Sequence, residues 1–213
     1  MMSKLYVISA PSGAGKTSLV RALLERRPQL VVSVSHTTRK PRTHELDGRD
    51  YYFVSPAQFE AMVQQGSFLE HARVFDNCYG TGAAQVRERL AAGRDVVLEI
   101  DWQGAQQVRR VMPDCVTIFI LPPSRVALQQ RLQQRRTDSA ESIARRLADA
   151  ITDMSHYREF DFVVVNDRFE QAVLELSAIL DGEARGEGRG VPDARGLRAE
   201  RAGLGPLVQQ LLN

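Results

Sequence analysis

The stretch Leu5-Tyr-Val-Ile-Ser-Ala-Pro-Ser-Gly-Ala-Gly-Lys-Thr-Ser18 decides the fold. Its first four apolar residues predict a short buried strand, and the small residues that follow predict a loop leading into a helix. Glycine at positions 13 and 15 allows backbone conformations that are closed to other residues, so that successive N–H groups can converge on a phosphate. The sequence therefore predicts a strand–loop–helix unit that binds a nucleoside triphosphate.

Two side chains at the end of this loop carry chemistry. Lys16 can reach the β- and γ-phosphates, and the hydroxyl of Thr17 can ligate Mg²⁺. The usual pattern begins with glycine, whereas this chain has Ala10 there. The alternative is a tight glycine turn with a chance lysine. The ATP-binding candidates in the loop are Ala10, Pro11, Ser12, Gly13, Ala14, Gly15, Lys16, Thr17 and Ser18.

Apolar runs alternate with helical patterns along the rest of the chain. We expect further buried strands at 95–100, 116–121 and 162–165, and helices at 17–27, 103–111, 124–134 and 169–180. Ser55, followed by Pro56 and Gln58, is typical of a helix N-terminus, and that helix should end near Gly66. The alternation predicts an α/β fold of the P-loop NTPase type, with a parallel sheet flanked by helices.

Composition excludes several classes of protein. The 213 residues are 43% hydrophobic and 25% charged, with a formal net charge of +2, so no global field indicates a nucleic-acid or membrane partner. The two cysteines give no disulfide framework, and the four histidines have no zinc-ligand spacing. No signal peptide and no run long enough to span a bilayer is recognised. We expect a cytoplasmic protein.

A second polar region lies at 33–53 and suits an acceptor phosphate. Arg39 and Arg42 supply planar fork donors, and Tyr51 supplies a neutral hydroxyl donor. The alternative is a solvated basic patch. Further along, Glu99 and Asp101 share a face near the carboxyl end of a predicted strand, where α/β sheets bind ligands. The sequence does not decide which of these two carboxylates approaches Mg²⁺.

Arginines are concentrated on two predicted helices joined at 137–139. An exposed basic face is one interpretation. In a phosphoryl-transfer enzyme, a lid that brings arginines onto the ATP phosphates is the better one. The arginines are Arg131, Arg135, Arg136, Arg145 and Arg146.

The chain from about residue 4 to about residue 180 resembles the guanylate kinase family, in its bacterial type. The resemblance rests on the glycine loop, the S-x-T-T-R-x-P-R motif at 35–42 and the D-Y-x-F block at 50–53. It also rests on Y-G-T at 79–81 and on the acid-ended strand before Gln103-Gly104. It implies transfer of the γ-phosphoryl group of ATP to GMP, giving ADP and GDP, with Mg²⁺ as cofactor.

The resemblance also implies roles for individual residues. Arg39, Arg42, Tyr51 and Tyr79 would hold the GMP phosphate. Ser35, Glu70, Thr81 and Asp101 would read the guanine. The implied catalytic set is Lys16, Arg39, Arg131, Arg135 and Arg146. Asn166 would contact the adenine end of ATP, although a strand-ending turn is the alternative there. Thr17 would bind Mg²⁺, with Asp101 as a second candidate.

The resemblance implies a domain at 1–181, with a GMP-binding lobe at about 35–90 and a lid at about 125–158 that close together. The Gly/Arg-rich segment 182–213 is expected to be a flexible extension with a terminal helix at 204–212. We expect the small molecules ATP and GMP as partners, no nucleic acid and no membrane, and leave a homo-oligomer open. The competing functions are a non-catalytic guanylate-kinase-like interaction domain, a P-loop kinase for a sugar phosphate, and an RNA-binding protein.

Overall fold

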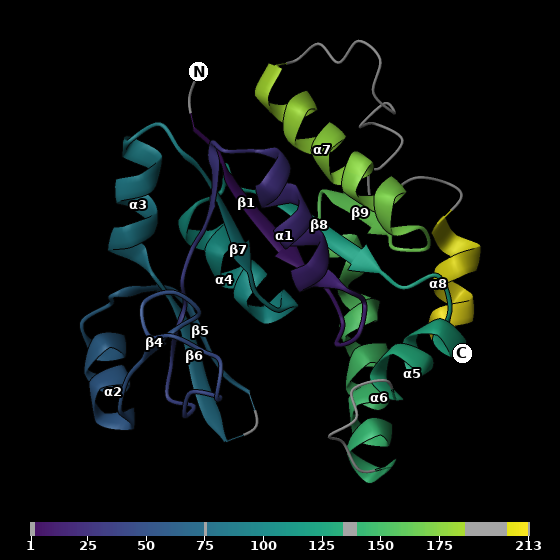
Figure 1. Cartoon of the computed structure of the whole chain (residues 1–213), viewed down its shortest axis with the longest axis horizontal. Coiled ribbons are helices and arrows are strands. Elements are labelled where there is room, and N and C mark those ends of the chain that lie inside the picture. The colour runs from purple at the N-terminus through teal and green to yellow at the C-terminus, as the bar shows by residue number, and fades with distance from the viewer. Residues whose placement is uncertain (1–2, 75, 134–139, 186–203, 213) are drawn as a thin grey trace. The chain divides into compact units, whose positions relative to one another are not determined.

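The computed structural model describes residues 3–74, 76–133, 140–185 and 204–212. The chain divides into two compact units (Figure 1). The first unit comprises Met1–Val7, Gln29–Leu98 and Gln103–Cys115, and the second comprises Ile8–Pro28, Glu99–Trp102 and Val116–Asn213.

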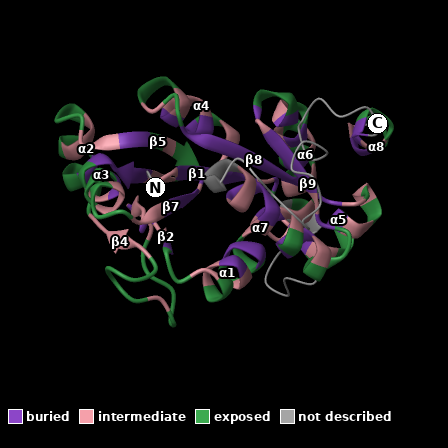
Figure 2. Ribbon diagram, turned by 90° about the horizontal axis from the view of Figure 1, so that it is seen from above, coloured by how far each residue is buried: buried purple, intermediate pink, exposed green. Residues whose placement is uncertain are grey.

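A five-stranded sheet has the order β2-β7-β1-β8-β9. Its strands are β2 (Leu30–Val32), β7 (Asp95–Glu99), β1 (Leu5–Ser9), β8 (Val116–Leu121) and β9 (Phe162–Val165). β2 pairs with β7 in parallel, and so does β8 with β9. Every residue of β1 and β8 is buried, as expected for parallel strands covered on both faces (Figure 2). The predicted strands and the predicted α/β class are confirmed.

Helices of the second unit follow the predicted pattern. They are α1 (Lys16–Arg26), α5 (Arg125–Gln133), α6 (Ala140–Ser155), the 3₁₀ helix η1 (His156–Glu159) and α7 (Phe169–Arg185). α1 packs on α7, and α7 packs on β9. An ion pair between Arg27 and Asp181, at 2.7 Å, also joins α1 to α7. Helix α4 (Trp102–Val111), which belongs to the first unit from Gln103 onward, begins one residue before its predicted start. Within the described residues, no helix is both long enough and apolar enough to cross a membrane.

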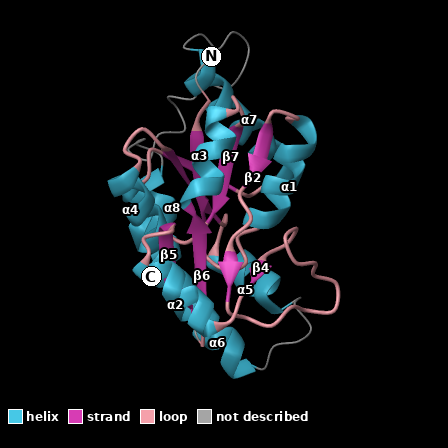
Figure 3. Ribbon diagram, turned by 90° about the vertical axis from the view of Figure 1, so that its left-hand side faces the viewer, coloured by secondary structure: helices cyan, strands magenta, loops and turns pink. Residues whose placement is uncertain are grey.

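The first unit contains a second, four-stranded sheet of order β4-β3-β6-β5 (Figure 3). Its strands are β4 (Tyr52–Phe53), β3 (His36–Thr37), β6 (Asn77–Gly82) and β5 (Phe68–Val74), and its helices are α2 (Pro56–Gln64) and α3 (Ala83–Ala91). Ser55 and Gln58 form the predicted capping box at the start of α2. The sequence predicted a lobe in this region without its strands. Two of them, β3 and β4, have only two residues each and leave no periodic signal.

The C-terminal part of the chain differs from expectation in two respects. Helix α7 continues to Arg185, so the predicted boundary at 181/182 falls inside a helix. The predicted terminal helix exists as α8 (Leu204–Leu212), but its part of the extension is packed rather than flexible. Leu204, Val208 and Leu211 are buried, and α8 packs on α6. Their spacing places all three on one face of the helix, which supplies the apolar contact that composition alone did not reveal.

Candidate active site

The glycine loop of the second unit has the backbone that its sequence predicts. Gly13 and Gly15 have φ angles of 88° and 93°, in the left-handed region that favours glycine. Helix α1 starts at Lys16, and its N-cap residue Gly15 makes no side-chain cap. The first N–H groups of α1 and the positive end of the helix dipole are therefore arranged to meet an anion.

Asn166, which directly follows β9, contacts this loop. Its side-chain amide is buried and donates a hydrogen bond to the carbonyl of Ala14 at 2.8 Å. A Cβ atom added to Gly15 would lie 2.5 Å from the Asn166 amide nitrogen, so glycine is required there by close approach as well as by its φ angle. The structure therefore gives Asn166 a role in shaping the loop, while its predicted contact with adenine stays a prediction.

Lys16 and Thr17 contact the last residue of β7 and the residue that follows it. The Lys16 ammonium donates to the Ile100 carbonyl at 3.1 Å, and the Thr17 hydroxyl donates to the Glu99 carboxylate at 3.1 Å. Asp101 is half-buried two residues after Glu99. Glu99, one of the two carboxylates that the sequence left open, is thus bonded to the predicted metal-binding hydroxyl.

The arginine cluster is only partly described. Arg131, on α5, donates to the Asn166 carbonyl at 3.0 Å, and its Nη1 atom is buried without a hydrogen-bond partner. Arg145 is exposed and Arg146 is half-buried on α6. Arg135 and Arg136, with the linking residues 137–139, lie outside the described residues. Arg131 is therefore the predicted lid arginine whose surroundings are best defined, beside the glycine loop.

In the first unit, Glu70 and Thr81 form a buried pair. They face each other across β5 and β6, and the Thr81 hydroxyl donates to the Glu70 carboxylate at 2.6 Å. Their exposed fractions are 4% and 1%. A carboxylate is buried only when hydrogen bonds compensate its lost hydration, so this placement is costly unless the group has a task. Two of the predicted guanine-reading residues are thus brought together.

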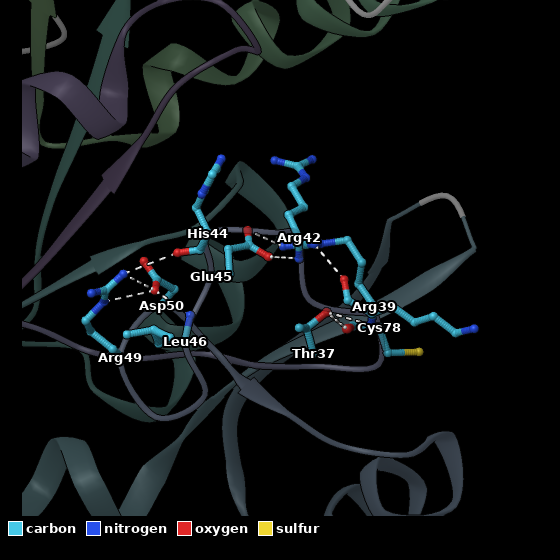
Figure 4. Close-up of polar contacts among 10 residues, drawn as sticks. Thr37, Arg39, Arg42, His44, Glu45, Leu46, Arg49, Asp50 and Cys78 are labelled. Carbon is cyan, nitrogen blue, oxygen red and sulfur yellow. Dashed lines mark hydrogen bonds and ion pairs between the residues drawn. The ribbon is translucent and has the colours of Figure 1, made fainter.

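Arg39 is held in place by the carboxylate of Glu45, which was not among the predicted site residues. Its guanidinium forms an ion pair with Glu45 at 2.7 Å, and the backbone N–H of Arg42 donates to the same carboxylate at 2.8 Å. Figure 4 shows Arg39 directed at Glu45, whereas the side chain of Arg42 extends away from it. The only advance signal was the spacing of Glu45 from two arginines.

Electrostatics around Arg39 follow from these bonds. The hydrogen bond to Glu45 is the main cause of its raised pKa, and a hydrogen bond to Tyr79 adds to it. The bond from Arg39 likewise lowers the pKa of the Glu45 carboxyl. Arg39 also lies 5.4 Å from the ring centroid of Tyr51, which contacts Tyr79 edge-on. The structure therefore gathers three of the four predicted phosphate-binding residues.

Ser35 and Asp101 are less closely tied to these groups. Ser35 is half-buried just before β3, and its carbonyl accepts the N–H of Tyr52 at 2.9 Å. Asp101 belongs to the second unit. Their predicted contacts with guanine stay predictions.

A strand, a glycine loop and a helix opening with Lys16-Thr17, beside an acid-ended parallel strand, define a P-loop nucleotide-binding protein. The model of the guanylate kinase family matches residues 2–183. The chain therefore belongs to the guanylate kinase family.

Individual relatives agree with this assignment. A guanylate kinase of Methylococcus capsulatus is 62% identical over 176 residues, which cover 83% of this chain and 86% of the relative. One from Chromohalobacter salexigens is 58% identical, covering 84% and 83%. The crystal structure of guanylate kinase from Anaplasma phagocytophilum has a TM-score of 0.72 and 34% identity, covering 86% of this chain and 87% of that one.

Proposed function

We propose that this chain transfers the γ-phosphoryl group of ATP to GMP, giving ADP and GDP. The observation that carries the acceptor assignment is the buried Glu70–Thr81 pair. Guanine presents N1–H and its 2-amino group side by side, and one carboxylate can accept both hydrogen bonds. Adenine has a lone pair at N1 and no 2-amino group, so a fixed carboxylate would repel it.

The donor half of the reaction is assigned to the glycine loop. The backbone N–H groups after Gly13 would bind the ATP phosphates, and Lys16 would move from the Ile100 carbonyl onto the β- and γ-phosphates. Arg131 supports this assignment, because its buried Nη1 atom has a donor to offer beside the loop. We also assign Arg135 and Arg146 to the ATP phosphates, on the motif match alone.

The residues present fit a magnesium ion that arrives with its nucleotide. Mg²⁺ in kinase sites keeps several waters and is held by one or two protein oxygens together with substrate phosphates. The Thr17 hydroxyl and the Glu99 carboxylate, 3.1 Å apart, supply such oxygens, and Asp101 follows close by in the chain. Among the described residues no group of three or more His, Cys, Asp or Glu could hold a metal ion by itself. When bound, Mg²⁺ would neutralise charge on the β- and γ-phosphates.

The acceptor half is assigned to the first unit. Arg39, oriented by Glu45, would present its fork of N–H donors to the GMP phosphate together with Tyr51 and Tyr79. Arg42 extends away from Glu45 and would add a second guanidinium. Ser35 and Asp101 are proposed as further contacts of the guanine.

The chemistry itself asks for little acid–base catalysis. Phosphoryl transfer passes through a loose transition state, so positioning and charge neutralisation supply most of the rate. Lys16 and the lid arginines would stabilise charge on the transferred group, and Arg39 would align the attacking oxygen of GMP. An interaction domain without catalysis would not need Lys16 and Thr17 bonded to the end of β7, which supports the enzymatic assignment.

A coupled assay of ADP release, run with GMP, AMP, CMP and UMP as acceptors, tests the proposal. We expect kcat/KM for GMP to exceed the other values by at least about 100-fold, because a site built around buried hydrogen-bonding groups rejects analogues that leave them unpaired. Equal rates with AMP, or ADP release that is independent of any acceptor, would refute it.

A further inference from the structure

A stacked pair of rings lies beside the donor half of the site. The rings of Trp102 and His156 have centroids 3.4 Å apart and an angle of 8° between their planes. The side chain of Trp102 also donates a hydrogen bond to Asp153, on the last turn of α6. We call these three residues, Trp102, Asp153 and His156, the Trp102 junction. All three belong to the second unit.

One side of the junction is the segment that contacts the glycine loop. Trp102 follows Glu99 and Ile100, which accept hydrogen bonds from Thr17 and Lys16 respectively. Glu99–Trp102 is therefore a single short segment, bonded at one end to the phosphate-binding side chains and stacked at the other end on His156.

The other side of the junction is the end of the lid helix. Asp153 lies in α6, which also carries Arg145 and Arg146, and His156 follows the helix directly. The imidazole Nδ1 contacts the Glu159 carboxylate at 2.6 Å, which orients the ring for stacking. Asp153 is half-buried, and its burial together with the nearby charge of Asp101 raises the pKa of its carboxyl to about 6.

We propose that Trp102, Asp153 and His156 are positioning residues for phosphoryl transfer. They attach the C-terminal end of α6 to the segment that contacts Lys16 and Thr17, and so fix where the α6 arginines lie relative to the glycine loop. This inference rests on the proposed function. Neither ring needs to touch a substrate for this role, because a misplacement of about 1 Å in a charge-stabilising group can cost about 100-fold in rate.

The test compares variants that remove the stack with variants that keep it. His156→Ala and Trp102→Leu should each lower kcat about 10- to 100-fold, with KM for GMP changed less than about threefold. His156→Phe keeps two facing rings and the hydrogen bond from Trp102 to Asp153, and should recover most of kcat. Trp102→Phe keeps the rings without that hydrogen bond and should recover less. The matched control is Arg158→Ala, which removes an exposed neighbour that contacts Tyr157 in the same 3₁₀ helix.

Two further readouts separate positioning from folding. Trp102 is the only tryptophan of the chain, so its emission reports on the junction directly. We expect a red-shifted emission in His156→Ala and a melting temperature close to wild type. The double variant Trp102→Leu/His156→Ala should lose no more kcat than Trp102→Leu alone, because Trp102→Leu already removes the ring contact that His156→Ala removes.

Wild-type turnover of GMP decides the proposed function independently of these variants. With that activity present, a wild-type kcat in His156→Ala would overturn the proposed positioning role of the Trp102 junction. Additive losses of kcat in the double variant would also overturn it. If His156→Ala fails to fold, His156→Phe decides: a folded variant with kcat as low as that of Trp102→Leu would also overturn it.

Discussion

The Thr81 hydroxyl donates a 2.6 Å hydrogen bond to the carboxylate of Glu70, and both side chains are buried. The register of β5 and β6 creates this pairing, because it places the two residues directly opposite each other. A short bond to a buried charge contributes more than an ordinary neutral one, and it restricts where the carboxylate can point. Thr81 is thus both a candidate guanine contact and the residue that orients Glu70.

Thr81→Val keeps the shape of the side chain and removes the donor. We expect the free energy of unfolding to fall by about 1–3 kcal/mol, the cost of leaving a buried acceptor with one bond fewer. Thr81→Ser should retain most of the stability, because it keeps the hydroxyl. Urea denaturation of the three proteins checks this. Equal stability of the valine variant and wild type would show that the bond is not important.

Lys16→Met tests the donor half. The charge of Lys16 should matter most when the transferred group develops charge, so we expect kcat to fall about 10²–10³-fold with the affinity for GMP nearly unchanged. The control Arg110→Met removes a positive charge from an exposed position at the end of α4. Steady-state kinetics on both variants provide the measurement. If Lys16→Met kept more than about a tenth of wild-type kcat, the proposed catalytic role of Lys16 would be wrong.

Helix α8 gives a prediction about stability. Leu211 is fully buried, whereas Gln210 beside it is exposed. Leu211→Ala should lower the free energy of unfolding by about 2–5 kcal/mol, and Gln210→Ala should leave it nearly unchanged. Turnover should persist at temperatures where Leu211→Ala stays folded, because the motifs precede residue 182. Equal melting curves for the two variants would mean that α8 adds nothing to the fold.

His36 makes the stability of the first unit depend on pH. Burial lowers the pKa of its imidazole below the usual 6.5, and the ring stacks on Tyr52 at 4.8 Å. The unfolded chain therefore binds a proton more readily, and stability should be full above about pH 6.5 and fall as the pH drops toward the folded-state pKa.

His36→Phe keeps an aromatic ring at this position and cannot titrate. The difference in stability between wild type and His36→Phe should thus shift against wild type between pH 7.5 and pH 5. Urea midpoints measured across that range check the prediction. A constant difference would show that folding does not change the pKa of His36.

Many elements of this protein were predicted from local sequence patterns, whereas contacts between residues far apart in the chain were not predicted. The glycine loop, the capping box at Ser55 and the strands β1, β7, β8 and β9 each carry their signal within a few residues. The stacking of Trp102 on His156 joins residues far apart in the chain, and nothing in the neighbourhood of either one indicates the partner. Glu45 was missed for a related reason, since most glutamates are surface residues and only the fold places this one on Arg39.

In the predicted lid, too, the helices were predicted and a contact between distant residues was not. Its helices were recognised from their apolar period, and α5 and α6 are present as expected. The packing of α8 on α6 was not predicted. The local sequence of a short apolar helix does not indicate which other element of the fold it packs on.

Whether Glu70 selects guanine is tested most directly by the ratio of kcat/KM for GMP to that for AMP. A bond to a charged partner contributes about 1.5–3 kcal/mol, so Glu70→Ala should lower kcat/KM for GMP about 10- to 100-fold with a much smaller effect on AMP. Glu60→Ala, at an exposed position on α2, is the matched control and should leave the ratio unchanged. Selection of guanine by Glu70 predicts a ratio that falls about 10- to 100-fold in Glu70→Ala alone. An unchanged ratio in that variant would contradict it.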